Sequence, residues 1–366
     1  MKKNSLVLFL NLGDSVESLE KSGQWERFLN EYLRRYCRHF ERVMVVSYGK
    51  SKGKNLPVNC EILTNRYKLH RFAYTILVPF LHYAQIKQAT VSRTMQATGG
   101  LPAIIVKFLW GMPAVVTYGY DYEKFADTER GRWLGLLVKI LVNFVVKKSD
   151  KVIVTNKNTL SRVKEAENTV LIPNGVNVNK FTPIQIYNRQ ITKIINIGRL
   201  TKQKNQELII KSIKNMPNVQ LTLVGRGRLR SKLLEITVKK EVNLKIIEKV
   251  THSKLSNILV QHDLYIQTSL VEGHPKALLE AMSVGLPCII ATDNLTDYGY
   301  LENNRHVIFC KLSEKSIRSA IIKLNSDVKL RQKLGKESRK LIETDFSLDT
   351  LLSKEIELLG NAAKNS

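Results

Sequence analysis

Short apolar runs alternate with longer amphipathic stretches along the first half of the chain. Uninterrupted runs of Val, Ile and Leu are typical of strands that are buried on both faces. Repeated strand–helix units of this kind predict a parallel sheet with helices on both sides. The strands are expected at residues 6–10, 43–47, 114–117, 152–155 and 170–172, and the helices near 21–39, 69–88, 99–109, 130–147 and 157–166.

The same pattern starts again after a cluster of turn residues between positions 173 and 183. Strands are expected at 193–197, 220–224, 244–247, 263–267 and 288–291, and helices near 203–214, 228–238, 253–260, 275–284, 313–325, 327–343 and 348–360. No strand follows the last helix. The sequence therefore predicts an α/β protein with two doubly wound domains, residues 1–170 and 171–366.

Composition and charge exclude some classes of protein but do not identify the function. The chain has 366 residues, of which 43% are hydrophobic and 25% charged, and this balance excludes a disordered chain. There are 58 Lys and Arg against 32 Asp and Glu, a net charge of +26 that is spread over both halves. Such a surface attracts nucleic acid, phosphorylated ligands or an anionic bilayer, and charge alone does not choose among them.

Targeting and metal signals are weak. The apolar run at residues 6–10 is too short for a signal peptide, and the four cysteines have no CxxC spacing, so reduced thiols in a cytoplasmic protein are expected. No zinc-ligand cluster is visible. The apolar stretch 133–146 is shorter than the roughly 18–20 residues that span a bilayer. A core helix is the favoured interpretation, and a helix lying on a membrane surface is the alternative.

The most informative stretch, residues 269–282, follows the strand expected at 263–267. Pro275 suits the first position of a helix, whose N–H groups can hold a phosphate or sugar oxygen. Gly273 allows the backbone to approach a ligand closely. Glu272 and Glu280 are eight positions apart, about two helical turns, so Glu280 can share a face with the helix start. Two carboxylates there can accept hydrogen bonds from vicinal hydroxyls, although a helix cap and a solvated face are the structural alternative.

A second cluster follows the first strand of the second domain. Gly198 permits a tight turn, and Arg199 and Lys204 place two cations at the end of the strand. Two cations at that position suit a diphosphate. Gly225 lies in a similar glycine turn after the next strand, which by itself is weak support.

These residues give the chain a resemblance to family 4 glycosyltransferases of the GT-B fold, and more loosely to bacterial surface-polysaccharide members. The element from Glu272 to Met282 resembles the E-x7-E motif of that family. The other matching pieces, in the order of the family, are Ile172-Pro-Asn-Gly-Val-Asn, Phe181-Thr-Pro183, Gly198-Arg-Leu with Lys204, Val224-Gly225 and Gly285-Leu-Pro287.

The resemblance implies two Rossmann-like domains that face each other across a cleft. It makes residues 1–170 an acceptor-binding domain and residues 171–366 a nucleotide-sugar-binding domain with a terminal helix that crosses back. It implies transfer of a sugar from a nucleotide-diphosphate sugar to a glycan or lipid-linked glycan, with retention of configuration and without a metal or other cofactor. Its carried-over site residues are Arg199 and Lys204 for the diphosphate, Glu272 for the sugar, Glu280 for the ribose, and Gly198, Gly225, Gly273, His274, Pro275, Lys276 and Ala277 as donor-binding neighbours.

The acceptor side departs from the family. Where many members have a His, this chain reads Thr117-Tyr118-Gly119-Tyr120-Asp121, so Tyr118, Tyr120 or Asp121 is expected to replace it. Gly13 and Gly23 are candidates for close approach of an acceptor. His39, His70, His82, His252, His262 and His306 form no cluster in the sequence and are interpreted as structural.

Two other functions stay open at this stage. The charge alone would suit a polyanion-binding α/β protein, although no nucleic-acid recognition motif is present and no nucleic-acid partner is expected. An epimerase or phosphorylase of the same fold is a nearer alternative. The basic surface also predicts a peripheral contact with the anionic cytoplasmic face of a membrane.

Overall fold

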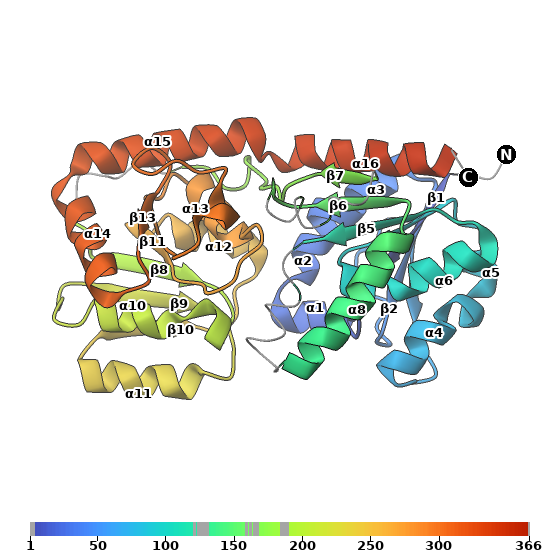
Figure 1. The fold of residues 1–366 in the computed structure, drawn as a ribbon, viewed down its shortest axis with the longest axis horizontal. Helices are drawn as coiled ribbons and strands as arrows, with labels where there is room; N and C mark the ends of the chain where they lie inside the picture. The colour runs from blue at the N-terminus through green and yellow to red at the C-terminus, as the bar shows by residue number, and fades with distance from the viewer. Residues whose placement is uncertain are drawn as a thin grey trace. The chain divides into compact units, whose positions relative to one another are not determined.

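The computed structural model describes residues 4–119, 122, 132–157, 160, 163, 168–183 and 190–364. The chain divides into two compact units. The first unit contains residues 1–173 and 351–366, and the second contains residues 174–350. Each unit is built on one sheet in which every strand is parallel to its neighbours, with helices on both sides (Figure 1).

The sheet of the first unit has seven strands in the order β3-β2-β1-β4-β5-β6-β7. In the register, Leu6 of β1 lies opposite Val43 of β2 and Val91 of β4. The strand order changes direction between β1 and β4, which makes that position the switch point of the sheet. The strands are β1 (Ser5–Phe9), β2 (Arg42–Ser47), β3 (Cys60–Thr64), β4 (Val91–Thr94), β5 (Ala114–Tyr118), β6 (Lys151–Val154) and β7 (Thr169–Leu171).

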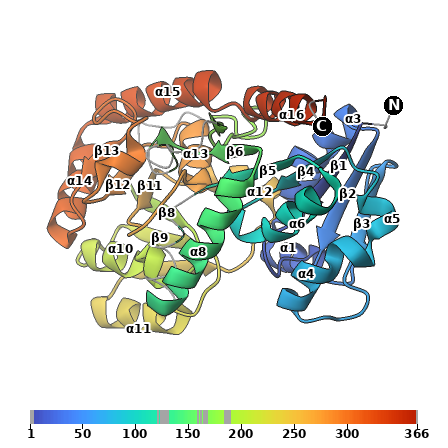
Figure 2. The same cartoon turned by 45° about the vertical axis from the view of Figure 1, so that its right-hand side comes forward.

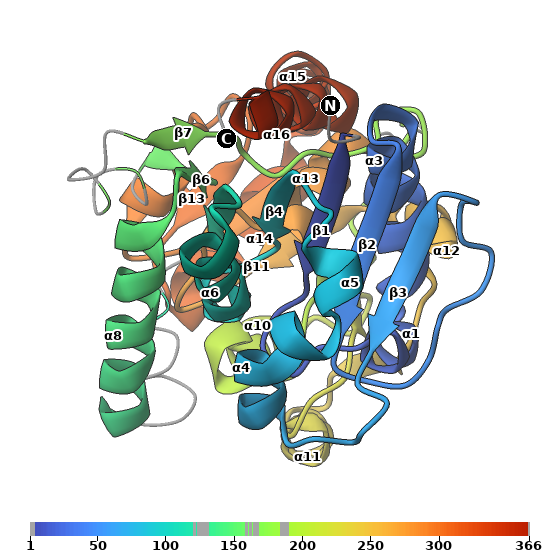
Figure 3. The ribbon, with the colours of Figure 1, turned by 90° about the vertical axis from the view of Figure 1, so that its right-hand side faces the viewer.

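Alternate residues of these strands enter two separate cores, one on each face of the sheet. The helices that follow β1 and the helices after β3 and β4 cover opposite faces of the sheet (Figure 3). Leu6 and Leu8 pack against the first group, whereas Val7 and Phe9 pack against the second. The first face carries α1 (Val16–Ser22), α2 (Trp25–Arg27), the π-helical segment Phe28–Leu33, α3 (Arg34–His39) and the end of α16 (Leu348–Lys364). The second carries α4 (Arg71–Leu81), α5 (Tyr83–Ile86), α6 (Leu101–Trp110) and α8 (Arg132–Lys148).

The helix α16 is fixed to the first unit by a buried ion pair. Arg93 of β4 donates from Nε to Glu355 Oε1 over 2.7 Å, and both side chains are buried. The hydroxyl of Tyr36 donates to the same carboxylate oxygen at 2.5 Å. Three polar groups thus satisfy one another inside an apolar core, which is the condition for burying charge at modest cost.

The sheet of the second unit has six strands in the order β10-β9-β8-β11-β12-β13, so its switch point lies between β8 and β11 (Figure 2). The strands are β8 (Lys193–Ile197), β9 (Gln220–Val224), β10 (Asn243–Ile247), β11 (Leu264–Gln267), β12 (Cys288–Ala291) and β13 (Ile308–Cys310). The helices are α10 (Gln206–Ser212), α11 (Arg230–Lys240) and α14 (Glu314–Ser326) on one face, and α12 (His252–Leu259), α13 (Lys276–Ser283) and α15 (Val328–Asp345) on the other.

Three strands of the structure, β3, β4 and β13, are not predicted by the pattern of apolar runs. β3 and β13 are short and only partly buried. β4 has Ser92, Arg93 and Thr94 in buried positions, so its residues do not read as an apolar run. The polar groups are satisfied by bonds such as the one from Arg93 to Glu355, which the local sequence does not reveal.

The stretch expected as a core helix forms α8 and is apolar on two sides. Val142 and Val145 are buried against the sheet, while Leu137 and Ile140 on the opposite side are exposed. Among the described residues, no helix combines the length and apolarity that a membrane span requires. The four cysteines are unbridged thiols.

Candidate functional site

The residues selected from the second half of the sequence gather at the switch point of its sheet. Gly198, Arg199 and Lys204 follow β8, and Glu272 to Ala277 follow β11, which is paired with β8. The strand order reverses here, so the loops leave a gap beyond the carboxyl ends of the strands where ligands of such sheets bind.

Polar contacts hold the β8 loop against the β11 loop. Gln203 donates from Nε2 to the carbonyl of Val271 at 2.8 Å, and its own carbonyl accepts from the N–H of Leu270 at 2.8 Å. The Thr268 hydroxyl donates to the carbonyl of Asn205 at 2.9 Å. These bonds fix the positions of the two loops relative to each other, and so of the charged groups that they carry.

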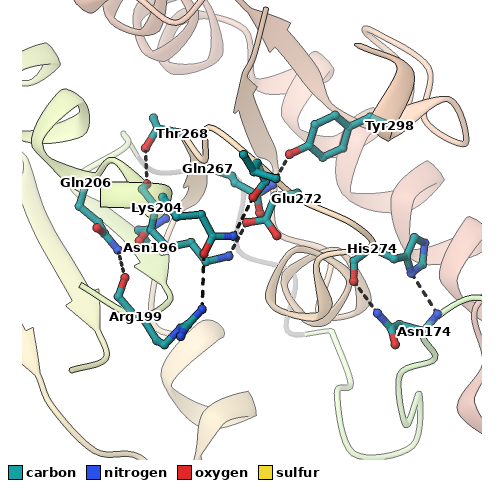
Figure 4. Close-up of polar contacts among 12 residues, drawn as sticks. Asn174, Asn196, Arg199, Lys204, Gln206, Gln267, Thr268, Glu272, His274 and Tyr298 are labelled. Atoms are coloured by element: carbon teal, nitrogen blue, oxygen red, sulfur yellow. Dashed lines mark hydrogen bonds and ion pairs between the residues drawn. The ribbon is translucent and has the colours of Figure 1, made fainter. Parts of the chain in front are cut away.

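A charged contact also joins the two loops. Lys204 Nζ forms an ion pair with Oε1 of Glu272, and both side chains are mostly buried (Figure 4). Lys204 has three N–H donors, so it can hold the carboxylate and a second anion together. Arg199 is exposed beside it, with Nη2 3.5 Å from Gln203 Oε1. Two cations and one carboxylate therefore share one end of the sheet.

Glycines make room for this arrangement. The side chain of Lys204 passes 3.3 Å from the point that a Cβ of Gly198 would occupy. Gly225 has φ +147°, and a Cβ there would lie 2.1 Å from the carbonyl oxygen of Gly198. The turn after β9 thus packs directly on the turn after β8, and Gly225 contributes to the shape of the site.

The helix α13 begins beside the ion pair. Pro275 is its N-cap and Lys276 its first helical residue, so the helix begins one position later than the sequence predicts. The first N–H groups of a helix have no partner within the helix, which suits them to an anion. Gly273, His274 and Pro275 are buried, and Lys276 and Ala277 are half-buried.

Glu280 is not on a solvated helix face. It is buried, and its Oε1 lies 3.1 Å from Nε2 of His252 at the start of α12. Lys180 Nζ lies 3.0 Å from the other ring nitrogen of His252. Folding thus brings His252, which is interpreted from the sequence as structural, to a carboxylate 28 positions away.

His274 is held by the loop that opens the second unit. The N–H of Asn174 donates to Nδ1 of His274 at 3.1 Å, and Asn174 Nδ2 donates to the carbonyl of His274 at 2.6 Å (Figure 4). The ring packs against Tyr300 and Phe346, with centroids 4.6 Å and 5.0 Å away. Burial, together with the charge of Lys276, lowers the pKa of His274 to about 3, so the ring is neutral at physiological pH.

The negative charge of Glu272 acts on three buried tyrosines. Burial first, and then the negative charge of Glu272, raise the pKa of Tyr265, Tyr298 and Tyr300 above the ordinary value. The hydroxyl of Tyr298 accepts from Gln267 Nε2 at 2.6 Å (Figure 4). Tyr298 and Tyr300 were not selected from the sequence, because they lie in a loop with no motif signal.

The acceptor-side candidates lie in the first unit. Gly23 has φ +75° and is the C-cap of α1, so the need for a left-handed residue at the end of that helix accounts for a glycine at this position. Gly13 has φ +84° in the turn after β1, at the switch point of its sheet. Tyr118 ends β5, with its ring 5.3 Å from that of Tyr122. Tyr120 and Asp121 lie outside the described residues.

No group of three or more His, Cys, Asp or Glu side chains could hold a metal ion within the described ranges. The polar groups that do converge on the switch point are cations, amides and a carboxylate. Such a set can bind a phosphorylated ligand that carries hydroxyls.

Sequence comparison connects this site with sugar transfer. Residues 184–341 match the family "Glycosyl transferases group 1". A glycosyltransferase of Methanocaldococcus jannaschii is 29% identical over 279 residues, which cover 62% of this chain and 67% of that protein. The UDP-Gal:alpha-D-GlcNAc-diphosphoundecaprenol alpha-1,3-galactosyltransferase of Escherichia coli is 27% identical over 284 residues, which cover 70% of this chain and 72% of that protein.

Structural comparison confirms the predicted fold class. Sucrose-phosphate synthase from Thermosynechococcus elongatus superimposes with a TM-score of 0.82 at 17% identity, covering 100% of both chains. Anabaena HepE in complex with UDP and glucose gives 0.77 at 15% identity, covering 97% of this chain and 99% of that one. The fold is therefore GT-B, with a Rossmann-like sheet in each unit.

Proposed function

Because residues 184–341 are a glycosyltransferase group 1 domain in a chain with the GT-B fold, we propose that this protein moves a sugar from a nucleotide-diphosphate sugar to a glycan or lipid-linked glycan. The observation that carries the proposal is the contact between Lys204 and Glu272 at the switch point of the second sheet. It puts a cation for a diphosphate beside a carboxylate for sugar hydroxyls.

Each group has a role that follows from its charge and position. Lys204 and Arg199 neutralise the charge that develops on the departing diphosphate. Glu272 accepts hydrogen bonds from the transferred sugar while Lys204 keeps one of its oxygens in place. The N-terminus of α13 faces the same anion, and Glu280 accepts hydrogen bonds from the ribose. Gly198, Gly225 and Gly273 let the backbone come close to the donor.

The stereochemistry, metal independence and acceptor are parts of the same proposal. Transfer proceeds with retention, and the leaving phosphate helps to take the proton from the acceptor hydroxyl. The reaction needs no metal. The acceptor is a precursor of a surface polysaccharide, and the curated relative from Escherichia coli supports this because its name gives a diphosphoundecaprenol-linked acceptor. Such an acceptor places the enzyme at the anionic cytoplasmic face of a membrane.

A thermal-shift panel of UDP, GDP, ADP and their sugars tests donor binding first. A ligand that binds only the folded state stabilises it by about 2.7 kcal/mol at one hundred times its Kd. UDP and its sugars form the first arm because the relative from Escherichia coli uses UDP-Gal. We expect one nucleotide series to raise the melting temperature. Salt-dependent binding of DNA without any nucleotide shift would favour a polyanion-binding protein instead.

Product analysis tests the reaction itself. We expect the nucleoside diphosphate and a new glycosidic bond in equal amounts, an anomeric configuration identical to that of the donor by NMR, and an unchanged rate in EDTA. An altered sugar still attached to the nucleotide would show an epimerase, and a sugar phosphate would show a phosphorylase.

A further inference from the structure

The outer side of α8 carries an apolar stripe that no described element covers. Trp133, Leu137, Ile140 and Phe144 recur at helical spacing, and the exposed fractions of Trp133 and Ile140 are 86% and 59%. The opposite side of the helix already provides the core contact through Val142 and Val145. The outer stripe is therefore not needed to hold α8 on its sheet.

The neighbouring helices continue this surface. α6 lies beside α8, and α4 lies beside α6, on the same face of the first unit's sheet (Figures 1 and 3). The inner residues of all three helices enter the same core. Their outer sides expose large apolar residues as well. We call the whole set the apolar face: Phe72, Ile76, Leu77 and Phe80 of α4, Tyr83 of α5, Phe108 and Leu109 of α6, and Trp133, Leu136, Leu137, Ile140 and Phe144 of α8.

The charges of these helices all have one sign. α4, α5, α6 and α8 contain no Asp or Glu, and residues 62–120 contain none either, against six Lys and Arg. The other long helices, α11, α14, α15 and α16, each carry at least one carboxylate. Apolar exposure and the absence of acidic residues thus coincide within these four helices.

Aromatic rings and cations are paired on this surface. The guanidinium of Arg71 lies 5.1 Å from the ring centroid of Phe72, and Lys87 Nζ lies 4.9 Å from that of Tyr83. Lys139, Lys147 and Lys148 are exposed along α8. Aromatic and aliphatic side chains flanked by Lys and Arg are the composition that settles at a bilayer surface.

We propose that the apolar face docks on an anionic phospholipid bilayer, with α8 lying in the plane of the interface. The apolar side chains enter the boundary between headgroups and acyl chains, and the cations contact the anionic headgroups. A second copy of this chain fits less well, because a two-fold interface would bring together the cations of helices that themselves contain no Asp or Glu. The purpose of the contact rests on the proposed function, since lipid-linked acceptors lie in the bilayer, but the contact itself needs no donor.

Vesicle flotation tests the proposal with variants that leave the net charge unchanged. Vesicles with about 30% anionic lipid are compared with neutral ones, from about 0.1 M to about 0.5 M NaCl. We expect binding to the anionic vesicles that salt weakens but does not abolish. The variant Leu137→Ser/Ile140→Ser should lower the partition coefficient about tenfold or more at both salt concentrations. The matched control, Val238→Ser/Ile322→Ser, removes exposed apolar residues of α11 and α14 and should bind as the original chain does.

Three results would overturn the proposal. They are no binding of the original chain at low salt, equal binding by the α8 variant, and a dimer in light scattering that the α8 variant converts to a monomer. The thermal shift with nucleotides is measured on the same proteins. Its persistence in the α8 variant shows an intact donor site, whereas its absence from every protein would remove the proposed function and leave the lipid result standing.

Discussion

His252 donates a hydrogen bond from Nε2 to Oε1 of Glu280 over 3.1 Å, inside the second unit. Lys180 Nζ, 3.0 Å from Nδ1, can only donate, so Nδ1 accepts and Nε2 is the nitrogen that donates to Glu280. The lysine thereby sets the tautomer that the carboxylate requires. His252 thus orients the Glu280 carboxylate, and Lys180 in turn orients the ring of His252.

Replacing Glu280 should weaken nucleotide binding. Glu280→Gln retains an acceptor but removes the charge that strengthens hydrogen bonds from ribose hydroxyls, so we expect the Kd to rise about tenfold or more. Calorimetric titration with the nucleotide identified by the thermal-shift panel measures this. Glu235→Gln, on the exposed side of α11, is the matched control. An unchanged Kd for Glu280→Gln would contradict the ribose role.

Much of the fold could be predicted from local sequence, because buried parallel strands need continuous apolar runs. β8, β9 and β12 begin and end where those runs do. The glycine and proline signals likewise identified the two loops of the site. β4 could not be predicted, since Arg93 becomes tolerable in a strand only through a carboxylate 262 positions away.

The pair His252–Glu280 was missed for the same reason. The two residues lie on different helices, and nothing in either local sequence indicates that the helices meet. The motif located Glu280, and only the tertiary structure shows what orients it.

Removing Lys204 should stop transfer without disturbing the fold. Lys204→Ala loses the cation nearest to Glu272, and we expect kcat/KM to fall about 10²–10³-fold because charge developing on the diphosphate is no longer stabilised. Arg199→Ala should act in the same direction. Lys202→Ala is the control, since Lys202 is exposed in the same short helical turn. The diphosphate assignment would be refuted by near-normal rates for Lys204→Ala with a normal circular dichroism spectrum.

The buried His274 should make the second unit sensitive to acid. Its pKa is lowered to about 3 in the folded state, whereas the ordinary value is 6.5. Between these values the unfolded chain binds more protons at this residue, so stability falls as the pH falls. The slope contributed approaches about 1.4 kcal/mol per pH unit.

Urea unfolding at several pH values below about 6.5 measures this slope. His274→Gln should flatten the acid dependence even if it lowers stability at neutral pH. His39→Gln, at an exposed helix end, should leave the dependence unchanged. Identical slopes for His274→Gln and the original chain would show that the ring is already accessible to protons when folded.

Neutralising Glu355 should destabilise the first unit. Glu355→Gln leaves the buried guanidinium of Arg93 without its counter-charge, and breaking a buried ion pair in this way costs about 3 kcal/mol or more. Glu357→Gln, on the exposed side of the same helix, is expected to change the free energy of unfolding by less than about 0.5 kcal/mol. Equal stability of the two variants would mean that α16 contributes through its apolar residues alone.

The place of α16 in the first unit also affects how the protein is made. A ribosome produces the strands of that unit early, but the carboxylate that completes the unit's interior is translated only after the whole second unit. Until then the nascent chain carries Arg93 without its partner and a bare surface where Leu351, Leu352 and Leu359 will pack. The first unit can therefore complete its interior only after the second unit has been translated, and until then this incomplete core is the apolar surface open to a chaperone.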